Sequence, residues 1–231
     1  MTKLFVRKYV EFYELFRLVV KPYDPHPYNL EFSPGNPTRG LWHLRLKEPI
    51  HLAKWPEKRD SPDPSVDVSV DVDVVVRYMQ GEMQHTRSSV YVTYFRRDSH
   101  ERIAKVLENL RFDFHPETGE ADHPLLHAHV FSDGKPNSYP DPLIKNFTID
   151  WDSLGKKLNG FRLPIPNMTL PSVLCCLVAC HLGTDMLKAL LDKTKKQRES
   201  FPSLAISPEQ LELFSRNSFA GSQWFERPTN N

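Results

Sequence analysis

The sequence has 231 residues, with 30 Lys and Arg against 29 Asp and Glu, so its formal net charge at pH 7 is +1. Because a chain of this length can bury about 70% of the surface that its unfolded form exposes, it needs neither a metal nor a disulfide to fold. The near-zero charge argues against a dedicated duplex-DNA binder, which carries a clear basic excess. It does not exclude a local charged or metal-binding site.

The three cysteines, Cys175, Cys176 and Cys180, lie together in one apolar stretch. An odd number of closely spaced cysteines does not suit a disulfide framework, so we expect free thiols in a reducing compartment. No apolar run reaches the length of a transmembrane helix, and the first residues lack the apolar core and cleavage site of a signal peptide. The sequence therefore predicts a cytoplasmic protein without membrane association.

The first 65 residues divide into a helix and a proline-rich arm. Apolar residues recur every three or four positions over residues 3–21 and predict an N-terminal helix, with Phe5, Tyr9, Phe12, Phe16 and Val19 on its buried face. Pro22 is expected to end it, and nine prolines between residues 22 and 64 favour an extended arm over residues 22–65. Alternation from Trp42 predicts one strand in this arm, Leu52 and Trp55 are expected to pack inward, and residues 56–64 are expected to form an exposed loop.

Residues 66–151 carry the strongest strand signals. Valines and polar residues alternate over residues 66–78, which predicts a long strand with one buried face. Residues 89–96 are its expected partner, central in the sheet, joined through a polar stretch at residues 80–88. Asp98 or Ser99 is expected to cap a short helix that carries Ile103, Val106, Leu107 and Leu110.

A second hairpin is predicted from two further alternating segments. One contains Leu110, Phe112 and Phe114, the other contains Leu126, Ala128 and Val130, and a turn over residues 116–123 joins them. Residues 133–142 are expected to form a turn-rich loop, and residues 144–151 an edge strand.

Helical signals dominate residues 167–220. Thr169 and Pro171 are expected to start a buried helix, Gly183 to end it, and Thr184 to start the next, which fades into a basic end at residues 193–198. Ser207, Pro208 and Gln210 predict a last short helix, followed by a tail over residues 221–231. The chain is thus expected to be one α+β domain, an antiparallel sheet of about five or six strands with the N-terminal helix and two or three C-terminal helices packed on it.

Histidines supply the first candidate site. If the second hairpin has the expected register, Arg111, Asp113, His115, His127 and His129 project from the face opposite the core. Imidazoles and a carboxylate at that spacing suit Zn²⁺ or a similar divalent ion, and histidine also serves as a general acid and base near neutral pH. The candidate metal ligands are therefore His115, His127, His129 and Asp113, although no cofactor is required by the sequence. The plain alternative is a set of ordinary surface histidines.

Charged and thiol residues supply weaker candidates. Arg96, Arg97 and Arg111 lie near Tyr91, Tyr94 and Phe95, a composition suited to anions or single-stranded nucleic acid, or simply to a structural face. Asp67, Asp71 and Asp73 form a carboxylate row that is expected to be a solvated face paired with Arg87, Arg96 and Arg97. The three cysteines are expected to be buried and unreactive.

Motifs of nucleotide-binding folds and serine hydrolases are absent from the sequence. Long proline-rich segments favour recognition of other proteins, so the leading hypothesis is an accessory or regulatory protein that binds a protein partner, and the sequence leans away from an enzyme. A metal-dependent hydrolase that uses the histidines and Asp113 on a phosphoester or an amide is the alternative. A binder of single-stranded nucleic acid is the second alternative.

Overall fold

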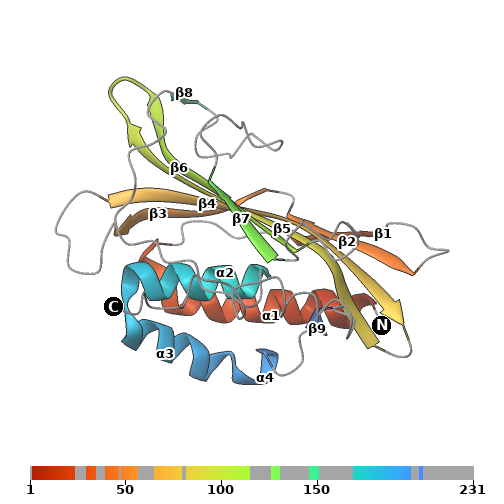
Figure 1. The fold of residues 1–231 in the computed structure, drawn as a ribbon. Coiled ribbons are helices and arrows are strands. Elements are labelled where there is room, and N and C mark those ends of the chain that lie inside the picture. The colour runs from red at the N-terminus through yellow and green to blue at the C-terminus, as the bar shows by residue number, and fades with distance from the viewer. Residues whose placement is uncertain are drawn as a thin grey trace, which may run out of the picture.

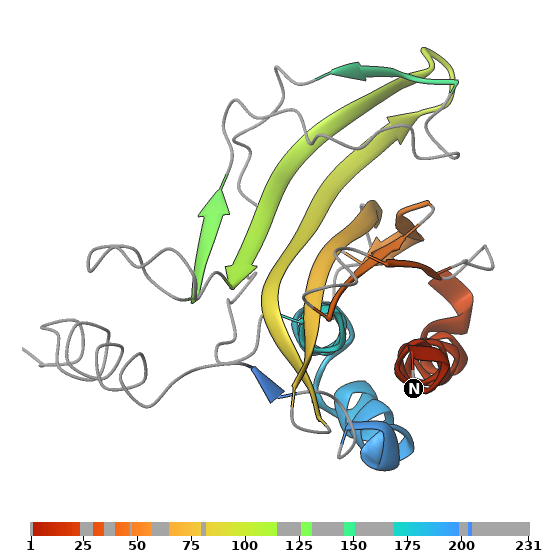
Figure 2. The same cartoon turned by 90° about the vertical axis from the view of Figure 1, so that its right-hand side faces the viewer.

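The fold was obtained as a computed structural model, which describes residues 2–23, 30–34, 40–46, 48–56, 65–79, 82–114, 126–130, 146–150, 169–198 and 203–204. These residues form a helical layer packed on one side of a twisted sheet (Figure 1). Turned by 90°, the long strands are seen to bend around the helices (Figure 2). The α+β class predicted from the sequence is confirmed.

Nine strands form a single sheet within the described residues. Its main path runs in the order β1 (Leu30–Pro34), β2 (Leu41–Leu46), β4 (Ser65–Met79), β5 (Glu82–Asp98), β6 (Ile103–Phe114) and β7 (Leu126–Val130), all antiparallel. Three strands lie off this path: β3 (Ile50–Pro56) pairs with β4, β8 (Thr148–Asp150) runs parallel to β6, and β9 (Ser203–Leu204) runs parallel to β5. The sheet is therefore larger than the expected five or six strands and is mixed.

The N-terminal helix and the helices from Thr169 to Arg198 lie close to the predicted places, whereas the helix expected after Asp98 is a strand. The first helix, α1 (Thr2–Val20), gives way to a 3₁₀ turn, η1 (Lys21–Tyr23), which contains Pro22. Thr169 is the N-cap of α2 (Leu170–Leu177), which continues into a π-helical turn, η4 (Val178–Leu182). Gly183 then has a φ of 86°, a conformation that glycine adopts without steric cost. It separates η4 from α3 (Thr184–Lys193) and the basic α4 (Lys195–Arg198).

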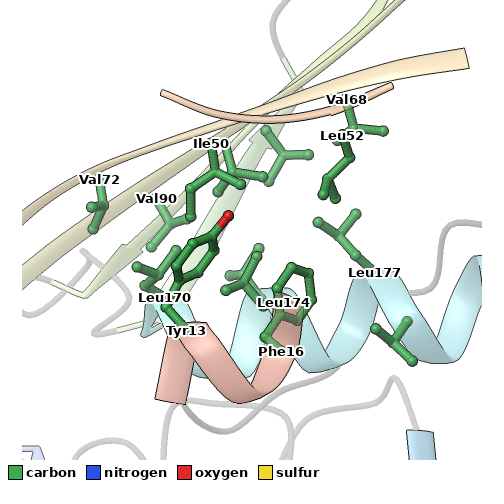
Figure 3. Packing of buried hydrophobic residues seen from close by; sticks show 14 of the residues in the cluster. Tyr13, Phe16, Ile50, Leu52, Val68, Val72, Val90, Leu170, Leu174 and Leu177 are labelled. Carbon is green, nitrogen blue, oxygen red and sulfur yellow. The ribbon is translucent and has the colours of Figure 1, made fainter. Parts of the chain in front are cut away.

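Packing of α1 and α2 against the valines of the sheet forms the main core (Figure 3). Tyr13 and Phe16 of α1 and Leu174 of α2 face the side chains of β3, β4 and β5. Trp55 and Leu52 of the proline-rich arm are completely buried here, as predicted, because β3 pairs with β4 on the side that the helices cover. The even-numbered valines of β4, all buried, are the sheet's contribution: Val66, Val68, Val70, Val72, Val74 and Val76.

The hairpin of β4 and β5 confirms the strongest strand prediction but is longer than expected. Val72 pairs with Val90, and β5 is central because it pairs with β6 on its other edge. The polar stretch at residues 82–88 is not a loop, since it continues β5 up to a pairing of Met79 with Glu82. Its polar side chains are compatible with a strand because one face of this sheet is polar.

The prediction of a helix after Asp98 is wrong, because residues 103–114 form β6. A β-bulge lies opposite the step from Tyr94 to Phe95, where Glu108 and Val106 are the partners and Leu107 is the extra residue. The bulge shifts the alternation by one residue, so Ile103, Val106, Leu107 and Leu110 acquire helix-like spacing. Asp98 does act as a cap, but of the tight turn into β6, where its Oδ1 accepts the N–H groups of His100 and Glu101 at 2.9 and 3.0 Å.

The second hairpin is confirmed, since β7 pairs with β6 in the expected register. β1 and β3 were not predicted as strands, and the edge strand at residues 144–151 is reduced to β8 in the described part of the chain. Several predictions fall outside the described residues: the loop at 57–64, the turns at 116–123 and 133–142, the helix beginning at Ser207, and the tail.

Candidate active site on the polar face of the sheet

The sheet face that the helices do not cover carries most of the candidate residues, and we call it the polar face. It is formed by the odd-numbered residues of β4 and their cross-strand partners, because neighbours across a sheet share a face. One row of partners runs from Arg45 through Asp73, Ser89 and Asp113 to His127. The next row runs from Asp71 through Tyr91 and Arg111 to His129.

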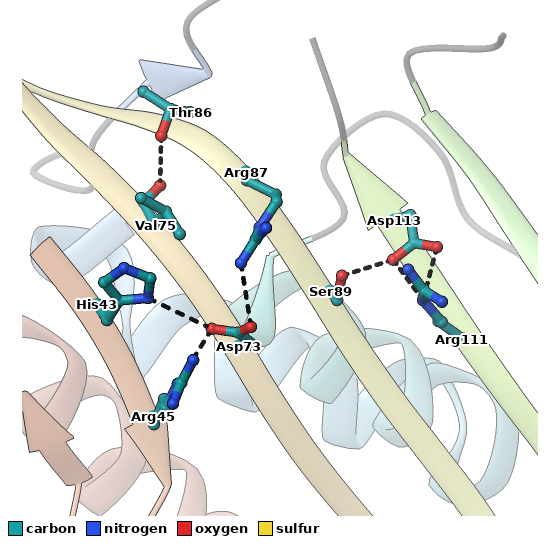
Figure 4. A network of polar contacts seen from close by, with 9 residues as sticks. All are labelled: His43, Arg45, Asp73, Val75, Thr86, Arg87, Ser89, Arg111 and Asp113. Carbon is teal, nitrogen blue, oxygen red and sulfur yellow. Dashed lines mark hydrogen bonds and ion pairs between the residues drawn. The ribbon is translucent and has the colours of Figure 1, made fainter. Parts of the chain in front are cut away.

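Asp113 is the buried centre of the first cluster on this face (Figure 4). Its carboxylate is completely buried, accepts a hydrogen bond from Ser89 Oγ at 2.6 Å, and lies 2.8 and 2.7 Å from Nε of Arg111 through its two oxygens. A buried carboxylate needs such compensation, because removing it from water is costly. Arg111 in turn stacks on Tyr91, with Cζ 5.6 Å from the ring centre. We call these residues the Asp113 cluster.

Arg111 is held in place yet keeps part of its hydrogen-bonding capacity. Its side chain is 31% exposed, and its only hydrogen bond to the described residues is donated by Nε. Both terminal nitrogens of its guanidinium group therefore remain able to bind an anion in bidentate fashion.

His127 and His129 are located by their register positions in β7. Asp113 pairs directly with His127, and Arg111 pairs directly with His129. This register is the one predicted from the sequence, and it brings four of the candidate residues into two adjacent cross-strand pairs on one face. His115, the remaining candidate ligand, lies outside the described residues.

A second cluster surrounds Asp73 (Figure 4). Its carboxylate is approached by Arg45 Nε at 3.4 Å, by Arg87 Nη2 at 3.3 Å and by His43 Nδ1 at 3.8 Å, from both neighbouring strands. The expected pairing of Asp73 with Arg87 is therefore confirmed. Arg45 and His43 were missed because β2 was not predicted to lie beside β4. We call these four residues the Asp73 cluster.

Asp67, by contrast, is a buried structural carboxylate. Two nitrogens of Arg97 bind it, its Oδ1 accepts the backbone N–H of Lys54 at 3.0 Å, and His51 Nε2 lies 3.9 Å away. Lys54 has a positive φ of 54° at the β-bulge of β3, so this carboxylate supports a backbone conformation that a non-glycine residue adopts at a cost. The expected partner Arg97 is confirmed, whereas the expectation of a solvated Asp67 is wrong.

The three arginines proposed to bind nucleic acid do not converge. Arg96 and Arg97 are neighbours in β5 and so project from opposite faces, with Lys105 and Ala104 as their partners. Arg97 is bound by Asp67, and Arg111 lies opposite Tyr91, towards the other end of β5. Tyr94 and Phe95 are buried, so neither ring is accessible for stacking on a base.

Sequence reasoning missed a polar group inside the core. His181 is buried, its Nδ1 lies 2.8 Å from the carbonyl oxygen of Pro56, and its Nε2 lies 3.1 Å from the hydroxyl of Tyr94. Since a carbonyl only accepts, Nδ1 donates to Pro56, and in the neutral imidazole with this tautomer Nε2 accepts from the hydroxyl of Tyr94. Burial, with nearby thiols as a smaller contribution, raises the pKa of Tyr94 well above its ordinary value, so this hydroxyl stays protonated and able to donate.

The cysteines match the expectation of buried thiols only at Cys176, since Cys175 and Cys180 are partly exposed. None of the three forms a disulfide, and the sulfur atoms of Cys176 and Cys180 approach each other to 3.9 Å. The hydrogen bond with Cys180, and then burial, raise the pKa of the Cys176 thiol far above its ordinary value. Because the thiolate is the nucleophilic form, Cys176 is not suited to nucleophilic chemistry.

Among the described residues, no group of three or more His, Cys, Asp or Glu is arranged to hold a metal ion, and no helix is long and apolar enough to cross a membrane. No protein-family model matches the chain, and no curated protein or solved structure matches it significantly.

Proposed function

We propose that this protein is a hydrolase acting on phosphoesters at the polar face of its sheet. The observation that supports the proposal is the pair of cross-strand partners Asp113 with His127 and Arg111 with His129. They combine a buried carboxylate, two groups that exchange protons near neutral pH and a guanidinium group with unused donors. Phosphoryl chemistry needs this set of groups, because a proton must be removed and another delivered while negative charge is stabilised.

Each residue has a distinct role in the proposed reaction. Asp113, fixed by Ser89 and Arg111, orients the imidazole of His127. One imidazole takes a proton from the attacking water as the new bond from oxygen to phosphorus forms. The other gives a proton to the leaving oxygen as its bond to phosphorus breaks. The terminal nitrogens of Arg111 hold the phosphate oxygens.

A Zn²⁺ ion bound by His115, His127, His129 and Asp113 is the competing form of this proposal. The carboxylate of Asp113 already binds a hydroxyl and a guanidinium group, and a neighbouring cation opposes the binding of a second one. This arrangement favours an orienting role for Asp113 over direct metal ligation, and hence proton transfer by the histidines.

Hydrolysis of bis(p-nitrophenyl) phosphate by the full chain tests the proposal. We expect His127→Ala and His129→Ala each to lower kcat by about 10²- to 10⁴-fold, the usual contribution of a general acid or base. His100→Ala, in the exposed turn after β5, should leave the rate unchanged. Absence of turnover by the unaltered protein, or unchanged rates in both variants, would overturn the proposal.

Chelation separates the two forms of the mechanism. Activity that survives exhaustive treatment with a chelator supports proton transfer by the histidines alone. Activity that is lost on chelation and restored by Zn²⁺, together with zinc measured in the purified protein, would replace it with the metal-dependent form.

A further inference from the structure

The Asp73 cluster contains more cationic groups than its single carboxylate can satisfy. Arg45 and Arg87 carry a charge at any physiological pH, so within this cluster they exceed Asp73 by one positive charge, before His43 and the cross-strand partner of Arg45, Glu31, are counted. All three approaches to Asp73, at 3.3 to 3.8 Å, are longer than the charge-assisted hydrogen bonds of a saturated ion pair.

Most donors of this cluster are unused within the described part of the chain. Each guanidinium group has five N–H donors, yet Arg45 gives one contact through Nε and Arg87 gives one through Nη2. His43 Nδ1 is a buried atom without a hydrogen bond. The side chains of Arg45 and Arg87 are 58% and 43% exposed, so their remaining donors can reach a ligand in solvent.

Arg111 provides a second position for an anion on the same face. Arg87 lies four residues along β5 from Tyr91, which pairs directly with Arg111. At about 3.3 Å per residue, this places the backbone positions of the two arginines about 13 Å apart along the strand. Their guanidinium groups are held at different carboxylates, Asp73 for Arg87 and Asp113 for Arg111, so they form two separate positions. The half-buried ring of Tyr91 lies under the planar guanidinium group of Arg111, at that end of the separation.

We propose that the substrate of the polar face is a single-stranded nucleic acid, with one phosphate bound by Arg111 and another, further along the strand, by Arg45 and Arg87. The inference rests on the proposed phosphoester hydrolysis and names its substrate class. Repeated phosphates, with bases between them that stack on a planar side chain, match two separated anion positions beside an aromatic ring. A duplex matches poorly, because carboxylates alternate with the arginines on this face and the net charge of the chain is only +1.

Fluorescence anisotropy with a labelled single-stranded RNA oligonucleotide tests the binding. We expect the double variant Arg45→Gln with Arg87→Gln to raise Kd about tenfold, and its logarithmic salt slope to fall by about 0.7, the value for one lost phosphate contact on a single strand. Arg7→Gln is the matched control, since Arg7 is also an exposed, carboxylate-paired arginine but belongs to α1 in the helical layer. Equal losses in both variants, or no loss in the double variant, would overturn the inference.

Competition experiments and activity measurements show whether the proposed substrate class or the proposed hydrolysis is at fault. Displacement of the RNA by heparin at equal charge concentration as readily as by unlabelled RNA would show plain polyanion binding and overturn the inference. The double variant should raise the KM for the oligonucleotide, whereas Arg7→Gln should leave unchanged both that KM and the rate on bis(p-nitrophenyl) phosphate. If the small substrate is not hydrolysed but oligonucleotide binding still depends on Arg45 and Arg87, the proposed hydrolysis fails and nucleic-acid binding stands.

Discussion

Buried and half-exposed carboxylates on the same sheet face have different energetic roles. Asp67 is 6% exposed and is neutralised by Arg97, whereas Asp73 is about one-third exposed and shares several weaker partners. Removing one partner of a buried ion pair leaves a charge without compensation, while an exposed pair is screened by water. Arg97 therefore contributes to stability, whereas Arg45 contributes little to it and is the arginine that we propose for binding.

Arg97→Gln should consequently lower the free energy of unfolding by about 2 to 4 kcal/mol. This loss is smaller than that expected for breaking a fully buried ion pair, because the side chain of Arg97 is one-quarter exposed. Arg45→Gln, with an exposed guanidinium group, should change the free energy of unfolding by less than about 0.5 kcal/mol. Urea denaturation of the two variants measures both values. A second substitution, Asp67→Asn, should recover part of the loss in the Arg97 variant, and equal effects of the two single variants would refute this difference.

At the scale of the strand, the hairpin of β5 and β6 depends on an ionised Asp98. The pKa of Asp98 is lowered from its ordinary value of 3.8, chiefly by the backbone N–H of Glu101 and also by that of His100. A lowered folded-state pKa contributes stability above the unfolded pKa, and this contribution disappears as the pH falls through the folded value. Asp98→Ala should therefore lower the urea midpoint at pH 7, and the difference from the unaltered protein should shrink below pH 3.8.

The control for this prediction is Asp98→Asn, which keeps an oxygen acceptor without the charge. Its urea midpoint at pH 7 should lie between those of Asp98→Ala and the unaltered protein. A difference between Asp98→Ala and the unaltered protein that stays constant down to acidic pH would mean that the ionised carboxylate is not what supports the turn.

Helix α1 offers a matched pair of positions for testing the core. Phe16 is completely buried against β3 and α2, while Leu18, two residues later, is 63% exposed. Phe16→Ala should cost about 3 to 5 kcal/mol through lost burial and a residual cavity, whereas Leu18→Ala should change stability by less than about 0.5 kcal/mol. Chemical denaturation checks this prediction. Equal effects would mean that α1 does not pack on the sheet as described.

Sequence patterns predicted elements wherever one periodicity ran without interruption. The valines of β4 and the apolar stripe of α1 are such cases, and both were placed correctly. The prediction failed around Leu107, because this bulged residue interrupts the strand alternation and gives the apolar residues of β6 a helix-like spacing. It also failed at β1 and β3, where prolines at residues 34, 49 and 56 masked short strands whose pairing with β2 and β4 is set by tertiary structure.

The candidate site was predictable only in part, where it depends on the alternation within single strands. The alternation of apolar and polar residues predicted that Arg111, Asp113, His127 and His129 share one face, because every second residue of a strand points to the same side of the sheet. The partners Ser89, His43 and Arg45 could not be predicted, since their proximity depends on which strands are neighbours and in what register. Recognition of a protein partner, favoured by the sequence, stays a prediction, as do the metal site and the single domain.

At the scale of the whole molecule, the main core and the two charged clusters lie on opposite faces of the sheet. The apolar face joins α1, α2 and α3 to β3, β4, β5 and β6 in one continuous core. The charged clusters lie on the other face and contribute no residue to that core. Because these clusters and the core share no residue, substitutions in the Asp73 cluster should alter binding without altering the fold.

A continuous core also predicts how the molecule unfolds. Because neither the helices nor the sheet can bury its apolar face alone, helical and aromatic signals should be lost in a single transition. Far-ultraviolet circular dichroism and tryptophan fluorescence should give coincident urea midpoints, and Phe16→Ala should shift both by the same amount. Two separated transitions, with Phe16→Ala moving only the helical one, would instead divide the chain into independently stable parts and contradict the single-domain prediction.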